Sequence, residues 1–272
     1  MQDIVILLNR QKVSDGMKYY TKLLKMGCFS WDELCEVVGS RKAADSIVRS
    51  YTQKGYIQSV KRSLYVAIDL ATGESAVSKF LIASRVTPTS YVSHHAAFDY
   101  YGCTNQVSYQ VKASSDTVFS SFDYAGITYT HIKSRINDGI VSQPDSVRIT
   151  DTERTILDGI NDFEKVMGLE ELLRCLELLP LVREEKLLTY LNSYGKQVLY
   201  QKTGYILWHF RNIWNLSNEF FSACEARVGK SKRYLYNTTI RDEMVFDRRW
   251  RLIVPHNLMG LVSKGVNFDA DI

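Results

Sequence analysis

The chain has 272 residues, of which 45% are hydrophobic and 24% charged, with 15 glycines and 4 prolines. This composition is that of an ordinary globular protein and excludes collagen-like, low-complexity and disordered chains. The longest aliphatic run, residues 4–8, is far shorter than the roughly 20 apolar residues of a membrane helix, so we expect no membrane span. The first residues lack the basic region and the long apolar region of a secretory signal, so we expect no such signal.

Five cysteines are scattered along the chain, and none forms a C-x-x-C pair, which disfavours a zinc ribbon or a redox site. We expect reduced thiols and a cytoplasmic location, because disulfides persist in oxidising compartments. No phosphate-binding glycine loop occurs, and the sequence predicts neither a metal nor a cofactor. The cysteines are Cys28, Cys35, Cys103, Cys175 and Cys224.

The charges are unevenly distributed along the chain. Residues 1–70 hold 11 basic and 7 acidic side chains, residues 71–170 hold 8 and 12, and residues 171–272 hold 15 and 11. A basic stretch of this length is typical of a small nucleic-acid-binding domain, so we treat residues 1–70 as the head and residues 71–272 as the body.

Helix signals come in close succession in the head. A helical stretch over residues 17–25 ends at Gly27. Ser30, with Glu33 three residues later, predicts a capping box and a helix over residues 31–38. Gly39 predicts the end of that helix, and Ser40 predicts the cap of a third helix over residues 41–53.

Two β-rich runs follow, residues 56–60 and 63–68, with Lys61 and Arg62 between them. This pattern predicts a hairpin with a basic tip. Three helices followed by a hairpin are typical of a winged helix-turn-helix, in which the third helix enters the major groove of DNA.

The outward face of the third helix and the hairpin tip carry the candidate DNA-binding side chains. Arg41 and Arg49 are suited to guanine edges, and the lysines to phosphates. Winged helices also serve as protein-interaction modules, and that alternative stays open. The candidate residues are Arg41, Lys42, Ser46, Arg49, Lys54, Lys61 and Arg62.

In the body, helical and alternating patterns succeed one another. Residues 71–73 read as a linker, and helical periodicity follows over residues 74–85. Ser93 predicts the cap of a helix over residues 94–101, and Asp151 predicts another cap. The sequence therefore predicts an α+β fold, in which a small, mainly antiparallel sheet is packed by helices. Strands are expected at residues 107–111, 117–119, 127–132, 147–150 and 250–254, and later helices at 168–179, 184–194 and 205–215.

Three segments of the body resemble the AbiEi antitoxin family of type IV toxin–antitoxin systems, found in bacterial phage-abortive-infection operons. The first is YVSHHAAFDYYG at residues 91–102, followed by Asn105 and Gln106. The second is ITDTERTILD at residues 149–158, and the third is KTGYIL at residues 202–207. The signature residues are Ser93, His94, Tyr101, Gln106, Asp151, Arg154 and Asp158.

The resemblance implies a function for each part of the chain. It implies that the head binds inverted repeats in its own promoter and represses transcription. It also implies that the body neutralises a nucleotidyltransferase toxin without a stable complex, and that the protein is not an enzyme. The alternative is a stand-alone regulator that has no toxin partner.

Some polar motifs invite other interpretations. Ser93, His94 and His95 are neighbours at the start of one helix, a placement that does not favour a catalytic triad. Arg154 and Asp158 are spaced to form an ion pair on one helix face, and they either stabilise the helix or belong to an antitoxic surface. Basic residues interleaved with aromatic ones near the C-terminus suit solvated loops or contacts with RNA or nucleotides. They are Lys232, Arg233, Arg248 and Arg249.

Overall fold

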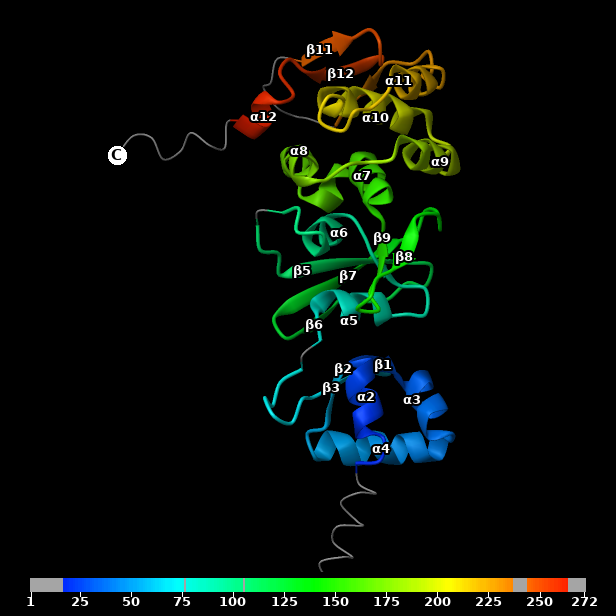
Figure 1. The fold of residues 1–272 in the computed structure, drawn as a ribbon, viewed down its shortest axis with the longest axis vertical. Helices are drawn as coiled ribbons and strands as arrows, with labels where there is room; N and C mark the ends of the chain where they lie inside the picture. Colours follow the sequence, from blue (N-terminus) through cyan, green and yellow to red (C-terminus); the bar gives the residue numbers. More distant parts are fainter. Residues whose placement is uncertain (1–16, 76, 105, 237–243, 264–272) are drawn as a thin grey trace, which may run out of the picture.

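The computed structural model describes residues 17–75, 77–104, 106–236 and 244–263. The described chain forms an elongated arrangement, with the head at one end, a six-stranded sheet in the middle and most helices of the body at the other end (Figure 1). The α+β fold predicted from the sequence is confirmed.

The head is a winged helix-turn-helix. Its sheet has the order β1-β3-β2 and is antiparallel throughout. The expected caps are present, because the Ser30 side chain accepts a hydrogen bond from the Glu33 amide, and the Ser40 side chain accepts one from Ala43. Gly39 ends its helix in the left-handed conformation. The elements are α2 (Tyr20–Met26), β1 (Cys28–Ser30), α3 (Trp31–Val38), α4 (Arg41–Gln53), β2 (Ile57–Lys61) and β3 (Leu64–Ala67).

The body begins with α5 (Lys79–Arg85), which packs with α6 (His95–Tyr100) on a six-stranded sheet of order β6-β7-β5-β4-β9-β8. Three strand pairings are antiparallel, whereas β5 with β7 and β4 with β9 are parallel. The two helices also contact each other, through an ion pair between Lys79 and Asp99 and through the rings of Phe80 and Tyr100. The strands are β4 (Tyr91–Val92), β5 (Gln110–Ser115), β6 (Phe122–Tyr124), β7 (Ile127–Lys133), β8 (Ile140–Ser142) and β9 (Arg148–Thr150).

The far end of the body is a helical layer with a small three-stranded sheet of order β10-β12-β11. Its core joins side chains of α7 to α11 with Trp250 and Leu252. The helices are α7 (Thr152–Asn161), the 3₁₀ turn η1 (Phe163–Val166), α8 (Leu169–Leu178), α9 (Glu184–Tyr194), α10 (Gln197–Phe210), α11 (Asn218–Glu225) and α12 (Gly260–Ser263). The strands are β10 (Arg233–Tyr234), β11 (Met244–Asp247) and β12 (Leu252–Pro255).

Several local expectations were wrong, among them the strand expected at residues 107–111, which begins only at Gln110. Ser93 does not cap the next helix; the N-cap is His94, with φ of 55° and no side-chain capping bond. Because Tyr91 pairs with Ser114 across β4 and β5, Ser93 reaches the end of β4 and bonds Ser114 instead. Residues 117–119 form no strand either, and Phe119 buries its ring against neighbouring side chains.

The head and the body share a hydrophobic core. Residue 70, the boundary expected from the sequence, lies in an exposed turn. However, Val60, Leu64 and Val66 of the hairpin pack in one cluster with Ile82 of α5 and Val92 of β4. The winged helix is therefore docked through its sheet onto the body, with α4 on the outer side (Figure 1).

Candidate nucleic-acid interface and buried polar network

The outer face of α4 presents the basic residues proposed from the sequence. Ala44 and Tyr51 point into the core of the head, which leaves the opposite face of α4 in solvent. No residue of that face forms an ion pair within the described part of the chain. The start of α4 is held by Trp31, which hydrogen-bonds Asp45 at 3.0 Å and packs under Arg41. The exposed residues are Arg41, Lys42, Ser46, Arg49 and Lys54.

The hairpin tip differs from the sequence expectation. Lys61 is half-buried, and its amino group lies 5.1 Å from the centre of the Phe119 ring and 5.2 Å from that of Phe122. Partial burial there lowers the pKa of Lys61. Tyr124 also hydrogen-bonds Gln58 of the hairpin at 2.9 Å. Lys61 therefore helps to hold the wing on the body, and its contact with a phosphate stays a prediction.

Arg62 is exposed, yet it borders a groove of about 660 Å³ between the hairpin tip, α3 and the body. Three acidic residues of α3, Asp32, Glu33 and Glu36, line the same groove. Arg85 of the body forms an ion pair with Glu33 across it. Lys61, Arg85 and Arg148 also line this groove, so the acidic side chains are matched by basic ones and the contact of Arg62 with DNA stays a prediction.

The ITDTERTILD segment forms a buried polar network at the start of α7. Asp151 caps α7 by accepting a hydrogen bond from the Arg154 amide at 2.9 Å. Its other oxygen accepts from Lys186 at 2.6 Å and from Tyr190 at 2.8 Å, both on α9. The expected cap is confirmed, and it also joins α7 to α9.

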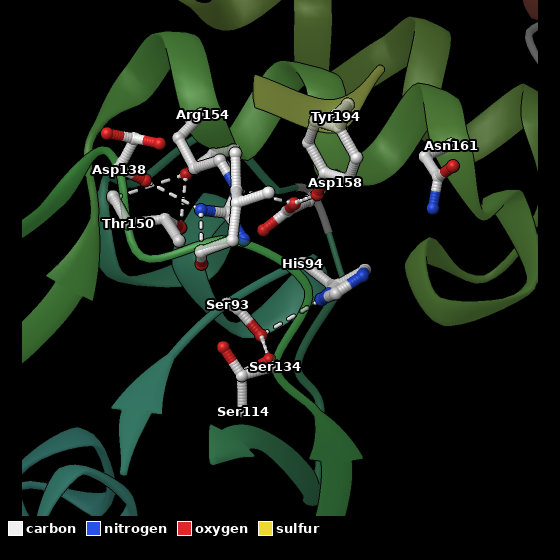
Figure 2. Close-up of polar contacts among 12 residues, drawn as sticks. Ser93, His94, Ser114, Ser134, Asp138, Thr150, Arg154, Asp158, Asn161 and Tyr194 are labelled. Carbon is white, nitrogen blue, oxygen red and sulfur yellow. Dashed lines mark hydrogen bonds and ion pairs between the residues drawn. The ribbon is translucent and has the colours of Figure 1, made fainter. Parts of the chain in front are cut away.

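Arg154 and Asp158 form the expected ion pair, with Nε 2.7 Å from the carboxylate (Figure 2). The guanidinium also donates to the carbonyls of Ile136 and Asp138, and the Tyr194 hydroxyl donates to Asp158. Both side chains of the pair are only 1–2% exposed. They stabilise the fold from inside, so the alternative of an antitoxic surface made by this pair is wrong.

The first signature segment is also mostly buried. The Ser93 hydroxyl lies 2.7 Å from that of Ser114 and 2.9 Å from Nδ1 of His94 (Figure 2). Burial lowers the pKa of His94 to about 4, so its ring is neutral near pH 7. Tyr101 donates a hydrogen bond to the Thr150 carbonyl at 2.7 Å. Gln106 is exposed and makes no hydrogen bond with a described residue, so the structure does not bring it together with the others.

The basic residues near the C-terminus take different places. Arg233 is exposed on β10, at one edge of the three-stranded sheet. Lys232 lies over the Phe246 ring at 4.8 Å. Arg249 lies over Trp208 at 4.0 Å and pairs with Glu225, whereas Arg248 is exposed without an ion pair to a described residue.

Two segments that lie far apart in the sequence meet in the structure. Gly204 of the KTGYIL segment faces the indole of Trp250, and a Cβ atom at residue 204 would lie 2.1 Å from that ring. Gln201 donates a hydrogen bond to the Trp250 carbonyl at 3.0 Å. The sequence signals of this contact are a glycine inside a helix and a tryptophan among arginines. Neither signal identifies the residue with which it makes contact.

The described residues include neither a helix that could span a membrane nor a cluster of side chains that could hold a metal ion. No helix there is both long and apolar enough to cross a membrane. No group of three or more histidine, cysteine, aspartate or glutamate residues among them is arranged to hold a metal ion.

The comparisons with known proteins identify a similar fold. The chain is similar to the structure of the RV2827C protein from Mycobacterium tuberculosis, with a TM-score of 0.56 over 88% of this chain and 89% of that one. Sequence identity is 12%, so the likeness concerns the fold. No protein-family model and no curated protein sequence matches the chain.

Proposed function

We propose that this protein is an antitoxin of the AbiEi type, which binds operator DNA in its own promoter and neutralises a nucleotidyltransferase toxin without a stable complex. The observation that carries the DNA-binding part is the basic face of α4, exposed and without ion pairs to described residues. The antitoxin part rests on the resemblance of the three body segments.

The geometry of α4 suits a recognition helix. With 13 residues, α4 is about 20 Å long, and an α-helix fits the width of the major groove. Lys42, Ser46 and Arg49 follow one another at helical spacing on the exposed face. Arg41 and Arg49 would read guanine edges, while Lys42 and Lys54 would neutralise phosphates on either side.

The alternative function is a transcriptional regulator without a toxin partner. A growth assay separates the two functions: the full-length chain is co-expressed with the gene next to its own, and cell growth is followed. Rescue from a toxic neighbour, also by a variant with Arg41, Lys42 and Arg49 changed to alanine, supports the antitoxin. Absence of rescue together with operator binding supports the regulator.

Titration of the operator by fluorescence anisotropy tests the DNA interface. Arg41→Ala and Arg49→Ala should each reduce discrimination against a scrambled site by about 1–3 kcal/mol. Lys42→Ala should weaken binding to all sequences and lower the salt slope by about one unit. Arg135, an exposed arginine of the body, provides the control Arg135→Ala. Wild-type affinity in all three α4 variants would contradict the interface.

A further inference from the structure

Four lysines of the body converge on the turn that joins α7 to η1, residues 161–165. They come from parts of the chain that lie far apart in the sequence, namely strand β5, the turn itself and the beginning of α10. All four side chains are half-buried, so they differ from lysines whose whole length is in solvent. The four residues are Lys112, Lys165, Lys196 and Lys202.

Two of these lysines hydrogen-bond the ends of the turn. Lys196, the N-cap of α10, donates to Oδ1 of Asn161 at 3.0 Å. Lys112 of β5 donates to the Glu164 carbonyl at 3.4 Å. The two ammonium groups therefore reach the same short segment from a helix on one side and from the sheet on the other.

The other two lysines contact the middle of the turn. Lys165 forms an ion pair with Asp162 at 2.8 Å. The Lys202 ammonium lies 4.6 Å from the centre of the Phe163 ring and forms no ion pair with a described residue. Each of the four ammonium groups is thus placed against a residue of one five-residue segment.

The positive charge at this turn exceeds the negative charge. Asp162 and Glu164 are the two acidic residues of the turn, and the C-terminal end of α7 adds about half a negative charge. Asp158, one turn earlier in α7, is already paired with Arg154. Four lysines against about two and a half negative charges leave an excess of about 1.5 elementary charges.

Partial burial makes this excess of charge unfavourable in the free protein. Burial lowers the pKa of Lys112, Lys196 and Lys202, and a positively charged neighbour lowers each pKa further. A cation that has lost part of its hydration gains more from a bound anion than a fully hydrated one does. Groups of this kind gather at ligand sites.

The three body segments singled out in the sequence come together around this turn. The turn follows the ITDTERTILD segment, and Lys202 is the first residue of the KTGYIL segment. The YVSHHAAFDYYG segment contributes the buried His94, which lies on the same side of the Arg154 guanidinium as Asn161 (Figure 2). A ligand bound at the turn would therefore be close to all three segments.

We infer that these four lysines bind the oligophosphate chain of a small anion such as a nucleoside triphosphate. A lysine ammonium is a compact point charge, so several of them at one place suit a chain of adjacent phosphate groups. A single-stranded RNA requires instead a positive groove that follows its backbone. The site is separate from the DNA interface proposed on α4, and the inference goes beyond the proposed function.

Titration of the full-length protein tests this site. The probes are inorganic triphosphate and adenosine triphosphate, and isothermal titration calorimetry measures their affinities in a buffer without divalent cations. The affinity should fall as the salt concentration rises. Binding of both probes identifies the oligophosphate chain as the recognised group. Binding of adenosine triphosphate alone shows that the nucleoside contributes as well.

Two variants remove one ammonium group each and keep a side chain of similar length. Lys202→Met and Lys112→Met should each weaken binding of adenosine triphosphate by about tenfold. Lys202→Arg keeps the charge and should stay within about threefold of the wild type. Because the two positions lie on different elements, either variant decides the question if the other does not fold, as checked by urea denaturation.

Lys18→Met is the matched control. Lys18 lies over the Tyr19 ring in the head, as Lys202 lies over the Phe163 ring in the body. The control variant should change the affinity by less than about twofold, because it removes a lysine–aromatic contact away from the turn.

Several results would overturn the proposal. They are failure of both probes to bind, wild-type affinity in a folded Lys202→Met or Lys112→Met variant, and an equal loss in Lys18→Met. Binding of a single-stranded RNA of about 10 nucleotides with a 5′-hydroxyl, in place of both probes, would also contradict it.

The inference and the proposed function fail separately. Arg49→Ala should lose operator discrimination and keep triphosphate binding, whereas Lys202→Met should do the reverse. A protein that binds its operator but neither probe retains the proposed function without this site.

Discussion

Two helices, α4 of the head and α7 of the body, use the same local signals for opposite purposes. Each begins at a capping side chain, Ser40 or Asp151, and each carries arginine within its first turn. In α4 the charged residues face solvent without ion pairs to described residues. In α7 they are buried, paired and hydrogen-bonded to other elements.

This difference shows that burial decides whether a charged motif is available for binding or stabilises the fold. An exposed arginine keeps its hydration and is available to an anionic ligand, whereas a buried one must be neutralised inside the protein. Substitutions in α4 should therefore change binding and spare stability, and substitutions in α7 should do the opposite. The following experiments test that division, from the largest expected effect to the smallest.

Removal of the acidic partner in α7 should have the largest effect. Asp158→Ala leaves the Arg154 guanidinium buried without its carboxylate, which should lower the free energy of unfolding by about 3–5 kcal/mol. Urea denaturation measures this change. Arg49→Ala, as the matched variant in α4, should leave the denaturation midpoint unchanged. Equal effects of the two variants would break the distinction between the helices.

The buried His94 should make stability depend on pH. Its pKa is lowered to about 4 in the folded protein, mainly by burial, against 6.5 in the unfolded chain. Below pH 6.5 the His94 ring is protonated in the unfolded chain, whereas in the folded protein it becomes protonated only near pH 4. Stability should therefore fall as the pH falls through this window, by roughly 3 kcal/mol in total.

His94→Asn is the matched variant for this experiment, because asparagine tolerates the positive φ of the site and does not titrate. Urea denaturation across the same window should show a smaller fall for this variant than for the wild type. Parallel curves for the two proteins would exclude His94 as the titrating group.

The contact between Gly204 and Trp250 should be sensitive to a single methyl group. Gly204→Ala places a Cβ atom inside the indole ring position and should cost about 1–3 kcal/mol of stability. Thermal or urea denaturation measures the loss. Ala97→Gly changes one methyl group in another helix, and it measures how much unfolding free energy is lost when any small buried residue is altered. In a Trp250→Leu background the Gly204→Ala penalty should shrink; an undiminished penalty would place its cause elsewhere.

Lys61 should have the smallest effect. Lys61→Met keeps the aliphatic stem and removes the contact of the ammonium with Phe119 and Phe122, worth about 0.5–1 kcal/mol. If these rings keep the amino group when DNA binds, the salt dependence of operator binding should not change. Lys42→Met should lower that salt slope instead. A lower slope for Lys61→Met would mean that the wing leaves the body when DNA binds.

The sequence was informative wherever neighbouring residues decide the structure. The capping box of Ser30 and Glu33, the left-handed Gly39 and the cap at Asp151 depend on contacts within one turn, and all were found as expected. The pairing of Arg154 with Asp158 also follows from helical spacing alone.

Sequence reasoning failed where distant segments compete for a side chain. Ser93 has the right position for a cap, yet Ser114, brought beside it by strand pairing, takes its hydroxyl. Lys61 has the right position for a wing tip, yet the Phe119 and Phe122 rings hold it. The contact of Gln201 with Trp250 joins residues more than 40 positions apart along the chain, and periodicity carries no signal of such a contact.

The docked hairpin also determines how the protein opens. Because Val60, Leu64 and Val66 share a core with Ile82 and Val92, strand β3 cannot separate from the body without exposing apolar surface on both sides. The backbone amides of β3 should therefore exchange with deuterium as slowly as those of β5, through global unfolding. Cutting the polypeptide at residue 70 would leave exposed apolar surface on both fragments. Point substitutions are therefore the safer way to separate the activities of head and body.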